Sequence, residues 1–168
     1  RNRSVFDDWM ILPRVLTDVT NGGTQIKLLD EILRHPIILA PVAFQKIAHP
    51  EGELATLEAA DCLETKMVVS TLATFDLEKL AKASSEKHWF QLYFQENRGF
   101  TLSLVRRAEA AGYSKLVVTI DAPLHGIRNR AQRAGFVLPE GIEAVNLKDR
   151  PALPRKILES NESVVLQG

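Results

Sequence analysis

The sequence predicts an α/β fold built on parallel strands, and three features of its central region support this class. Residues 88–93 and 115–121 are apolar along most of their length, as parallel strands covered on both faces are. Between them, Leu104, Ala108 and Ala111 recur at helical spacing, and Gly112 follows as a C-cap. Both strands finish in polar side chains, and α/β folds keep their chemistry where parallel strands end. Strand, helix and strand in this order form a βαβ unit.

Composition describes an ordinary globular domain. The chain has 168 residues, of which 45% are hydrophobic and 25% charged, and its 21 basic residues balance its 21 acidic ones. This balance gives no electrostatic signature for nucleic acid, and no apolar run approaches the roughly twenty residues of a membrane span. The single cysteine, Cys62, cannot form an internal disulfide, which agrees with a reducing, cytoplasmic location. The helical pattern around Cys62 predicts a buried apolar role for this residue.

Residues 1–35 read as a lead-in followed by a hairpin. Residues 14–19 are rich in β-branched side chains and are typical of a strand, and the Asn21-Gly22-Gly23 run after them is a strong turn signal. Residues 24–33 alternate well enough to predict a hairpin that turns near Asp30 and Glu31.

Residues 36–121 are expected to hold four strands, with a helix after each of the first three. The predicted strands cover residues 36–41, 67–70, 89–93 and 115–121. Residues 51–60 form the first expected helix, with Leu54, Leu57 and Ala60 turned inward. Thr74 is predicted to cap the second helix, with Asp76 in its positive first turn.

The periodic pattern ends after Asp121. Residues 122–168 carry many charges and four prolines, and no helix is predicted there. Loops longer than about 15 residues are uncommon in compact domains, and many of them are functional lids. Since this segment follows the fourth strand, we expect it to be a lid over the rim where the strands end.

The polar groups at the predicted strand ends are an amide, several hydroxyls and a phenol. They come from Ser70, Thr71, Gln91, Tyr93 and Thr119. They suit a flat heteroaromatic ligand whose edge alternates carbonyl oxygens with N–H groups, because a glutamine amide donates and accepts at once. The alternative is structural, with satisfied strand-end hydroxyls and a tyrosine that packs at the rim of the core. The sequence shows no metal-ligand spacing and no glycine-rich phosphate loop, so no metal site is predicted.

Asp121 ends a strand that is expected to be buried. A buried carboxylate needs a partner, because burying an unpaired charge is costly. No neighbour in the sequence obviously supplies that partner.

Several segments together resemble the FMN-dependent 2-hydroxy acid oxidases and dehydrogenases, the family of glycolate oxidase, lactate oxidase and mandelate dehydrogenase. They are PVAFQKIAHPEGE at 41–53, FQLY at 90–93, LVRRAE at 104–109, TID at 119–121 and FVLP at 136–139. The likeness covers nearly the whole chain. It implies a (β/α)8 TIM barrel, of which residues 1–168 resemble the N-terminal part of a single FMN-binding domain. In that frame, residues 1–35 are the lead-in and bottom hairpin, 36–121 hold strands one to four, and 122–168 are the lid loop.

The resemblance assigns roles to the strand-end residues. It implies that the backbone at Val42 and Ala43 passes along the flavin, and that Ser70, Gln91 and Thr119 hydrogen-bond the edge of its ring.

The substrate side is assigned in the same way. Tyr93 matches the tyrosine that faces the substrate hydroxyl, and Asp121 matches the carboxylate that orients a catalytic histidine. Arg128 matches an arginine that helps to hold the substrate carboxylate. Leu72 stands where glycolate oxidase-like members carry an aromatic residue, which implies a larger or more apolar acid, lactate-like or beyond.

The histidine base, the flavin lysine and a second arginine belong to later strands of the family, and no residue of this chain matches them. The resemblance therefore implies FMN-dependent oxidation of an L-2-hydroxy acid only together with the C-terminal half of the barrel. It also implies a homo-tetramer, and inactivity of these residues by themselves. Two alternatives stay open: a catalytically silent half-barrel with a structural or binding role, and another flavin barrel such as a diphosphate isomerase.

Overall fold

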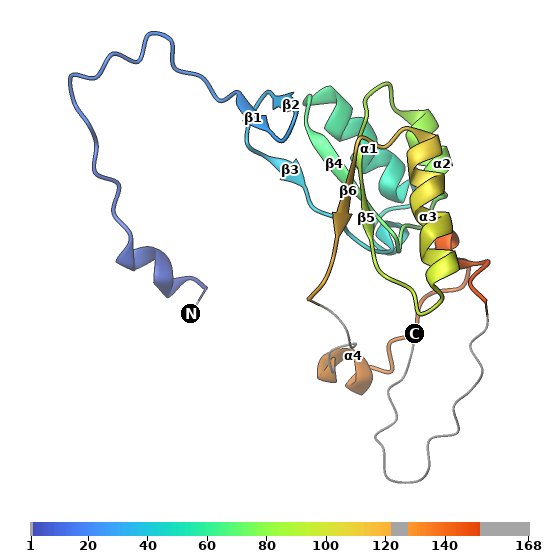
Figure 1. Cartoon of the computed structure of the whole chain (residues 1–168). Coiled ribbons are helices and arrows are strands. Elements are labelled where there is room, and N and C mark those ends of the chain that lie inside the picture. Colours follow the sequence, from blue (N-terminus) through green and yellow to red (C-terminus); the bar gives the residue numbers. More distant parts are fainter. Residues whose placement is uncertain (1, 122–127, 152–168) are drawn as a thin grey trace. The chain divides into compact units, whose positions relative to one another are not determined.

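The computed structural model describes residues 2–121 and 128–151, which belong to two compact units divided after Pro36 (Figure 1). The first unit has a 3₁₀ helix, η1 (Ser4–Asp8), and two short strands, β1 (Ile26–Leu28) and β2 (Glu31–Leu33). These strands pair antiparallel, with Ile26 opposite Leu33, so the hairpin predicted near Asp30 is confirmed. The expectation of a strand at residues 14–19 is wrong, because that segment is exposed and pairs with none of the described strands.

The second unit is built on four parallel strands in the order β3-β4-β5-β6. They are β3 (Ile38–Leu39), β4 (Lys66–Ser70), β5 (Trp89–Leu92) and β6 (Lys115–Val118). Three helices follow the first three strands: α1 (Gly52–Cys62), α2 (Leu77–Ala83) and α3 (Arg98–Ala111). The remaining elements are η2 (Gln45–Ile47), α4 (Asn129–Arg133) and η3 (Val145–Leu147). The predicted alternation of the first three strands with helices is therefore confirmed. The expectation that residues 122–168 contain no helix is wrong, because the short α4 and η3 lie there.

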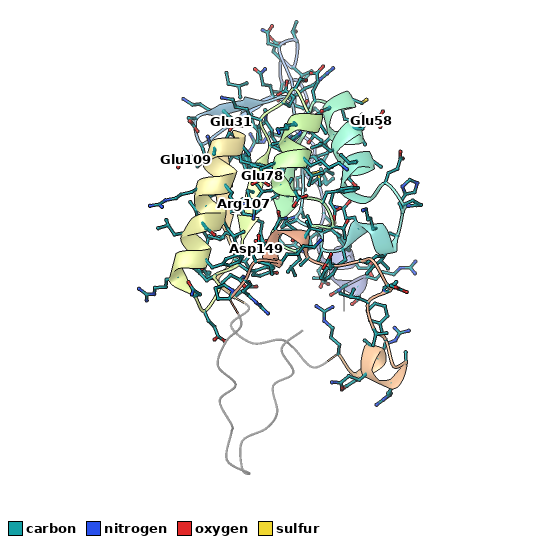
Figure 2. The ribbon with its side chains drawn as sticks, turned by 90° about the vertical axis from the view of Figure 1, so that its right-hand side faces the viewer. Glu31, Glu58, Glu78, Arg107, Glu109 and Asp149 are labelled. Carbon is teal, nitrogen blue, oxygen red and sulfur yellow. The ribbon has the colours of Figure 1, made fainter. Side chains whose placement is uncertain are left out.

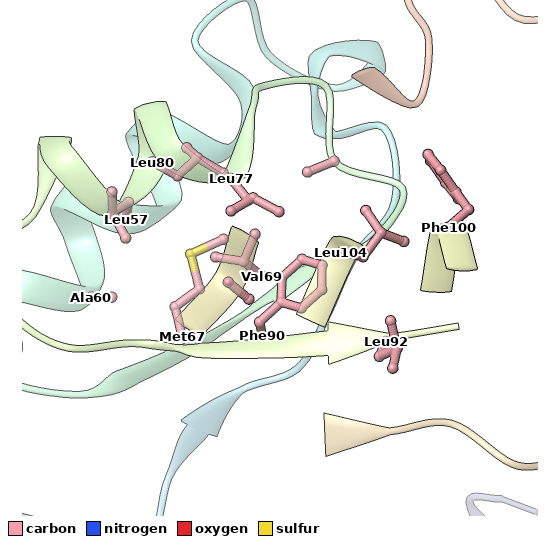
Figure 3. Packing of buried hydrophobic residues seen from close by; sticks show 12 residues of the cluster. Leu57, Ala60, Met67, Val69, Leu77, Leu80, Phe90, Leu92, Phe100 and Leu104 are labelled. Atoms are coloured by element: carbon pink, nitrogen blue, oxygen red, sulfur yellow. The ribbon is translucent and has the colours of Figure 1, made fainter. Parts of the chain in front are cut away.

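The core lies between these helices and one face of the sheet (Figure 3). Because side chains alternate along a strand, Met67 and Val69 of β4 face the same side as Phe90 of β5. They pack against helical side chains, namely Leu57, Ala60, Leu77, Leu80, Leu104 and Ala108. Ser70 and Gln91 stand on the opposite face, away from this cluster.

Two expectations about burial are wrong. β6 was expected to be covered on both faces, but Leu116 and Val118 remain 42% and 39% exposed. Leu116 and Val118 line an open groove beside Leu102 and Val105 of α3, so the described helices cover this face of β6 only in part. Cys62 is also exposed, because it is the last residue of α1 and lies beyond the buried Ala60.

The buried His88 lies at the amino end of β5 and connects β4 to α1. Its Nδ1 accepts a hydrogen bond from the Met67 backbone N–H at 3.1 Å, and its Nε2 lies 2.9 Å from Asp61 Oδ1. Since a backbone N–H can only donate, the ring proton sits on Nε2 and is donated to Asp61. Ser84 Oγ approaches the same ring nitrogen at 3.1 Å, so the three side chains cannot relay a proton as a catalytic triad does.

The buried Asn146 of η3 connects this segment to α2 and α3 by hydrogen bonds. Its Oδ1 accepts a hydrogen bond from the Leu77 N–H at 3.0 Å, at the start of α2, and Arg107 Nη2 lies 3.4 Å from the same oxygen. Arg107 also donates to both carboxylate oxygens of Glu78, at 2.7 and 2.9 Å (Figure 2). The resulting cluster links α2, α3 and η3.

Within residues 2–121 and 128–151, none of the helices has both the length and the apolar character that crossing a membrane requires.

We predict that His88→Ala lowers the free energy of unfolding of the full-length protein by about 1–3 kcal/mol, because the buried Met67 N–H then has no acceptor. The exposed His49 offers a matched control, since His49→Ala removes the same side chain from the surface. Urea unfolding followed by circular dichroism measures both variants. Equal losses in the two variants would contradict this role for His88.

A second prediction concerns pH. The hydrogen bond from Arg107 holds the pKa of Glu78 below its ordinary value, so the ion pair stabilises the fold at neutral pH and is lost as the pH falls through that lowered pKa. About a third of each side chain is exposed, so Glu78→Gln should cost up to about 1 kcal/mol at pH 7. The cost should shrink steadily on acidification. Glu58→Gln, on the exposed face of α1, makes the same change of side chain elsewhere and serves as the control in the same unfolding series.

Candidate functional site

Three of the predicted site residues form one hydrogen-bonded row across the carboxyl ends of β4, β5 and β6. Gln91 is the centre: its Oε1 lies 3.4 Å from Ser70 Oγ, and its Nε2 lies 3.0 Å from Thr119 Oγ1. The Thr71 backbone N–H also donates to Gln91 Oε1, at 3.2 Å. Ser70, Gln91 and Thr119 therefore converge, as the sequence predicted, although the burial of Gln91, with 1% of its surface exposed, was not foreseen.

The direction of every bond in this row follows from one backbone donor. A backbone N–H can only donate, so the group of Gln91 that faces Thr71 is the amide oxygen, and the amide nitrogen must face Thr119. Thr119 then accepts through its oxygen, which leaves its own hydroxyl hydrogen free to point elsewhere. One hydrogen of the Gln91 amide is likewise not used by Thr119.

Thr71 fastens the end of β5 to the end of β4. Its buried hydroxyl donates to the Gln91 backbone oxygen at 2.6 Å and accepts from the Tyr93 backbone N–H at 3.1 Å. The backbone of Tyr93 is therefore held at the rim, and its side chain is half-buried there. This agrees with the predicted convergence of strand ends, because Thr71, which follows β4, hydrogen-bonds the backbone of both Gln91 and Tyr93.

The loop after β3 carries Val42 and Ala43, which are both exposed. The Phe44 N–H that follows them donates to the Leu72 backbone oxygen at 3.1 Å, so this loop lies against the loop after β4. Phe44 itself adopts left-handed backbone angles, φ 52° and ψ 47°, which are unfavourable for a residue with a Cβ atom. Leu72 is half-buried, and its own N–H donates to Ser70 Oγ at 3.1 Å.

The structure does not bring Asp121 and Arg128 into the row. The expectation that Asp121 is buried is wrong: β6 ends at Val118, and Asp121, three residues later, is exposed. Arg128 is also exposed, and precedes the first residue of α4. The intervening residues 122–127, like 152–168, lie outside the described residues, so the lid predicted there is not tested.

The row fits the edge of a flat heteroaromatic ring in the chemistry of its groups. The Thr119 hydroxyl and the second Gln91 amide hydrogen are donors for ring carbonyl oxygens, and the hydroxyl oxygens of Ser70 and Thr119 can accept from a ring N–H. The exposed residues Val42 and Ala43 lie in the loop after β3, which is hydrogen-bonded to the loop after β4. Elsewhere in the described part of the chain, no three His, Cys, Asp or Glu side chains are grouped so as to hold a metal ion.

Two buried polar residues near this rim were missed at the sequence level. Glu53, in α1, receives hydrogen bonds from the loops after β3 and β4. Asn146 occupies the amino end of α2, where Thr74 had been expected as the cap. The Thr74 expectation is wrong, because α2 begins only at Leu77 and the side-chain oxygen that accepts from the Leu77 N–H is that of Asn146. The Thr74 hydroxyl donates to Glu53. The position of Glu53 on the helical face that also carries Leu57 and Ala60 could have signalled its role, since a buried carboxylate needs hydrogen-bond donors.

Comparison with known proteins points to one family. The model of the family of FMN-dependent dehydrogenases matches residues 1–166. An L-lactate oxidase of Alicycliphilus denitrificans is 43% identical over 167 residues, which cover 99% of this chain and 46% of the relative. A glycolate oxidase of Spinacia oleracea is 40% identical over 147 residues, covering 88% of this chain and 40% of the relative.

Solved structures agree with these relatives. A crystal structure of mandelate oxidase with (S)-4-hydroxymandelic acid superimposes with a TM-score of 0.81 at 40% identity, covering 86% of this chain and 41% of that one. The chain thus spans about half the length of the curated relatives it matches. The four described parallel strands and their helices form part of a TIM barrel, so the fold class predicted from the sequence is confirmed.

Proposed function

The chain belongs to the family of FMN-dependent dehydrogenases, and we propose that the protein containing it uses FMN to oxidise an L-2-hydroxy acid to the 2-oxo acid. The observation that carries this proposal is the Ser70–Gln91–Thr119 row, in which a single backbone N–H fixes the direction of every donor and acceptor. Relatives that share this half of the chain are named for the oxidation of lactate, glycolate and 4-hydroxymandelate.

In this proposal the row binds the edge of the isoalloxazine ring. The Thr119 hydroxyl hydrogen and the second Gln91 amide hydrogen donate to ring oxygens, while Ser70 remains an acceptor beside them. The backbone of the exposed residues Val42 and Ala43 passes along one side of the same ring in this proposal. FMN, when bound, supplies the two-electron acceptor for the hydroxy acid.

The substrate is proposed to sit over the rim between Tyr93 and Arg128. The Tyr93 phenol faces the substrate hydroxyl, and the planar guanidinium of Arg128 holds the substrate carboxylate, for which two parallel N–H groups are suited. Leu72, in the loop after β4, accepts the Phe44 N–H of the loop after β3 and supports an apolar substrate side chain, lactate-like or larger. Asp121 would orient a catalytic histidine from the C-terminal half of the barrel and raise its basicity.

The proposal includes partners. The described strands leave apolar Leu116 and Val118 of β6 partly exposed, which agrees with a C-terminal half-barrel that packs beside this edge. A homo-tetramer and a cytoplasmic location are further parts of the proposal; the single cysteine supports the second.

The function is tested by the visible spectrum of the full-length protein as purified. We expect a yellow protein with flavin absorbance that bleaches without oxygen when lactate, mandelate or a longer 2-hydroxy acid is added. The acid that bleaches it fastest identifies the substrate class. A colourless protein that takes up no added FMN would instead support a silent half-barrel.

Gln91→Leu in the full-length protein should weaken flavin retention, because it removes the acceptor of the Thr71 N–H and releases the Thr119 hydroxyl from its fixed direction. Loss of one such set of hydrogen bonds should raise the FMN dissociation constant by about tenfold or more. FMN fluorescence quenching on the apoprotein measures it. Gln25→Leu makes the same change at an exposed position and should bind FMN as the wild type does; unchanged binding in Gln91→Leu would refute this role.

A further inference from the structure

Glu53 is a fully buried carboxylate that the proposed reaction does not use. It lies in the first turn of α1 with 0% of its surface exposed. Oε1 accepts hydrogen bonds from the Gln45 N–H at 3.2 Å and from the Thr74 N–H at 2.9 Å, and Oε2 accepts from the Thr74 hydroxyl. All three donors are neutral, and they come from two different loops. Glu53 therefore joins two segments that are far apart in the sequence.

These two loops are the ones that carry the first half of the flavin rim. Gln45 follows Val42 and Ala43 in the loop after β3, and Thr74 follows Ser70 in the loop after β4. The Ser70–Gln91–Thr119 row connects β4, β5 and β6, but it does not reach the loop after β3. Glu53 and the bond from the Phe44 N–H to the Leu72 oxygen supply the connection that the row lacks.

The loop after β3 needs such a restraint, because Phe44 stands in the left-handed region of backbone conformation. A residue with a Cβ atom stays there only where the surrounding contacts hold it. The Phe44 N–H is held by Leu72, and the next N–H along the chain, that of Gln45, is held by Glu53. Release of Gln45 would allow Phe44 to relax and would move Ala43, which directly precedes it.

The approach of α1 to both loops is close enough to require a glycine. Gly52 has φ +47°, and a Cβ atom there would lie 2.9 Å from Lys46 Cγ, 3.1 Å from the Lys46 nitrogen and 3.3 Å from Thr74 Oγ1. The residue before Glu53 therefore brings the start of the helix against both loops at once. This contact places the Glu53 carboxylate within reach of Gln45 and Thr74.

From these contacts we infer that Glu53 is a positioning residue for the flavin site, which sets the backbone of Val42 and Ala43 relative to Ser70. The inference rests on the proposed function, because it concerns the same cofactor. Glu53 touches neither the flavin nor the acid. It accepts the Gln45 N–H of the loop after β3 and the Thr74 N–H of the loop after β4, and so holds the first loop beside the second, which follows Ser70.

The test compares FMN binding to the apoprotein of the full-length wild type with that of three variants. Glu53→Ala should raise the FMN dissociation constant by about tenfold or more, since both loops lose their shared hydrogen-bond acceptor. Glu53→Gln keeps an oxygen for the two N–H donors and should recover most of that loss. Glu58→Ala, on the exposed face of the same helix, should bind FMN as tightly as the wild type.

Amide hydrogen exchange on the same apoproteins gives a readout that does not involve FMN. The Gln45 and Thr74 amides should exchange at least about tenfold faster in Glu53→Ala than in the wild type, because their acceptor is gone. If Glu53→Ala does not fold, Thr74→Val replaces it; that variant removes only the hydroxyl donor and should weaken FMN binding in the same direction, by less.

The outcomes separate the inference from the function it rests on. A wild type that binds FMN beside a folded Glu53→Ala with unchanged affinity overturns the inference alone. A Glu53→Gln variant that binds FMN as weakly as Glu53→Ala would also overturn it, because an oxygen acceptor for the Gln45 and Thr74 N–H groups would then not restore the site. A wild type that binds no FMN, with normal protection of the Gln45 amide, overturns the proposed function.

Discussion

The backbone N–H of Thr71 is the constraint on which the rim depends. Because it can only donate, it decides which end of the Gln91 amide points toward β4 and which toward β6. A lone glutamine between two hydroxyls could take either orientation, and the row would then offer a mixture of donors and acceptors. With Thr71 in place the orientation is single, so a ligand meets a fixed pattern and no reorganisation is needed before binding.

The same device appears at the opposite end of the same pair of strands. At the floor, the Met67 N–H donates to His88 Nδ1; at the rim, the Thr71 N–H donates to Gln91 Oε1. In both cases a backbone donor of the β4 segment selects the state of a polar side chain from the β5 segment, a tautomer in one and an amide orientation in the other. His88 uses its remaining ring nitrogen for Asp61 and Ser84, which stabilises the fold. At the rim, one Gln91 amide hydrogen and the Thr119 hydroxyl hydrogen are not used within the row. This division matches the usual separation of stability and chemistry in α/β barrels.

Local pattern predicted the parts of the fold that local forces decide. The strands β4 and β5, the helix α3 and the cap at Gly112, which has φ +94°, all follow from apolar period and glycine placement. Thr74 shows where such reasoning ends: its sequence position suits a helix cap, but α2 begins only at Leu77, and the Thr74 hydroxyl donates to the buried Glu53 carboxylate. The cap position then passes to Asn146, which is 69 residues away from Leu77 along the chain. No local pattern could indicate that exchange, because both partners are distant in sequence.

The candidate site divides in the same way. Ser70, Gln91 and Thr119 were predictable because parallel strands in register bring their ends together, and each residue finds its partner within the described sheet. Asp121 and Arg128 have no such support: both are exposed, beyond the end of β6, and their assignment rests on resemblance. The Ser70–Gln91–Thr119 row, in which the orientation of the Gln91 amide is fixed, is preorganised by this half of the barrel. A substrate side made of exposed groups on irregular backbone must take its geometry from whatever packs against it, and the partly uncovered β6 is the surface on which that packing would begin.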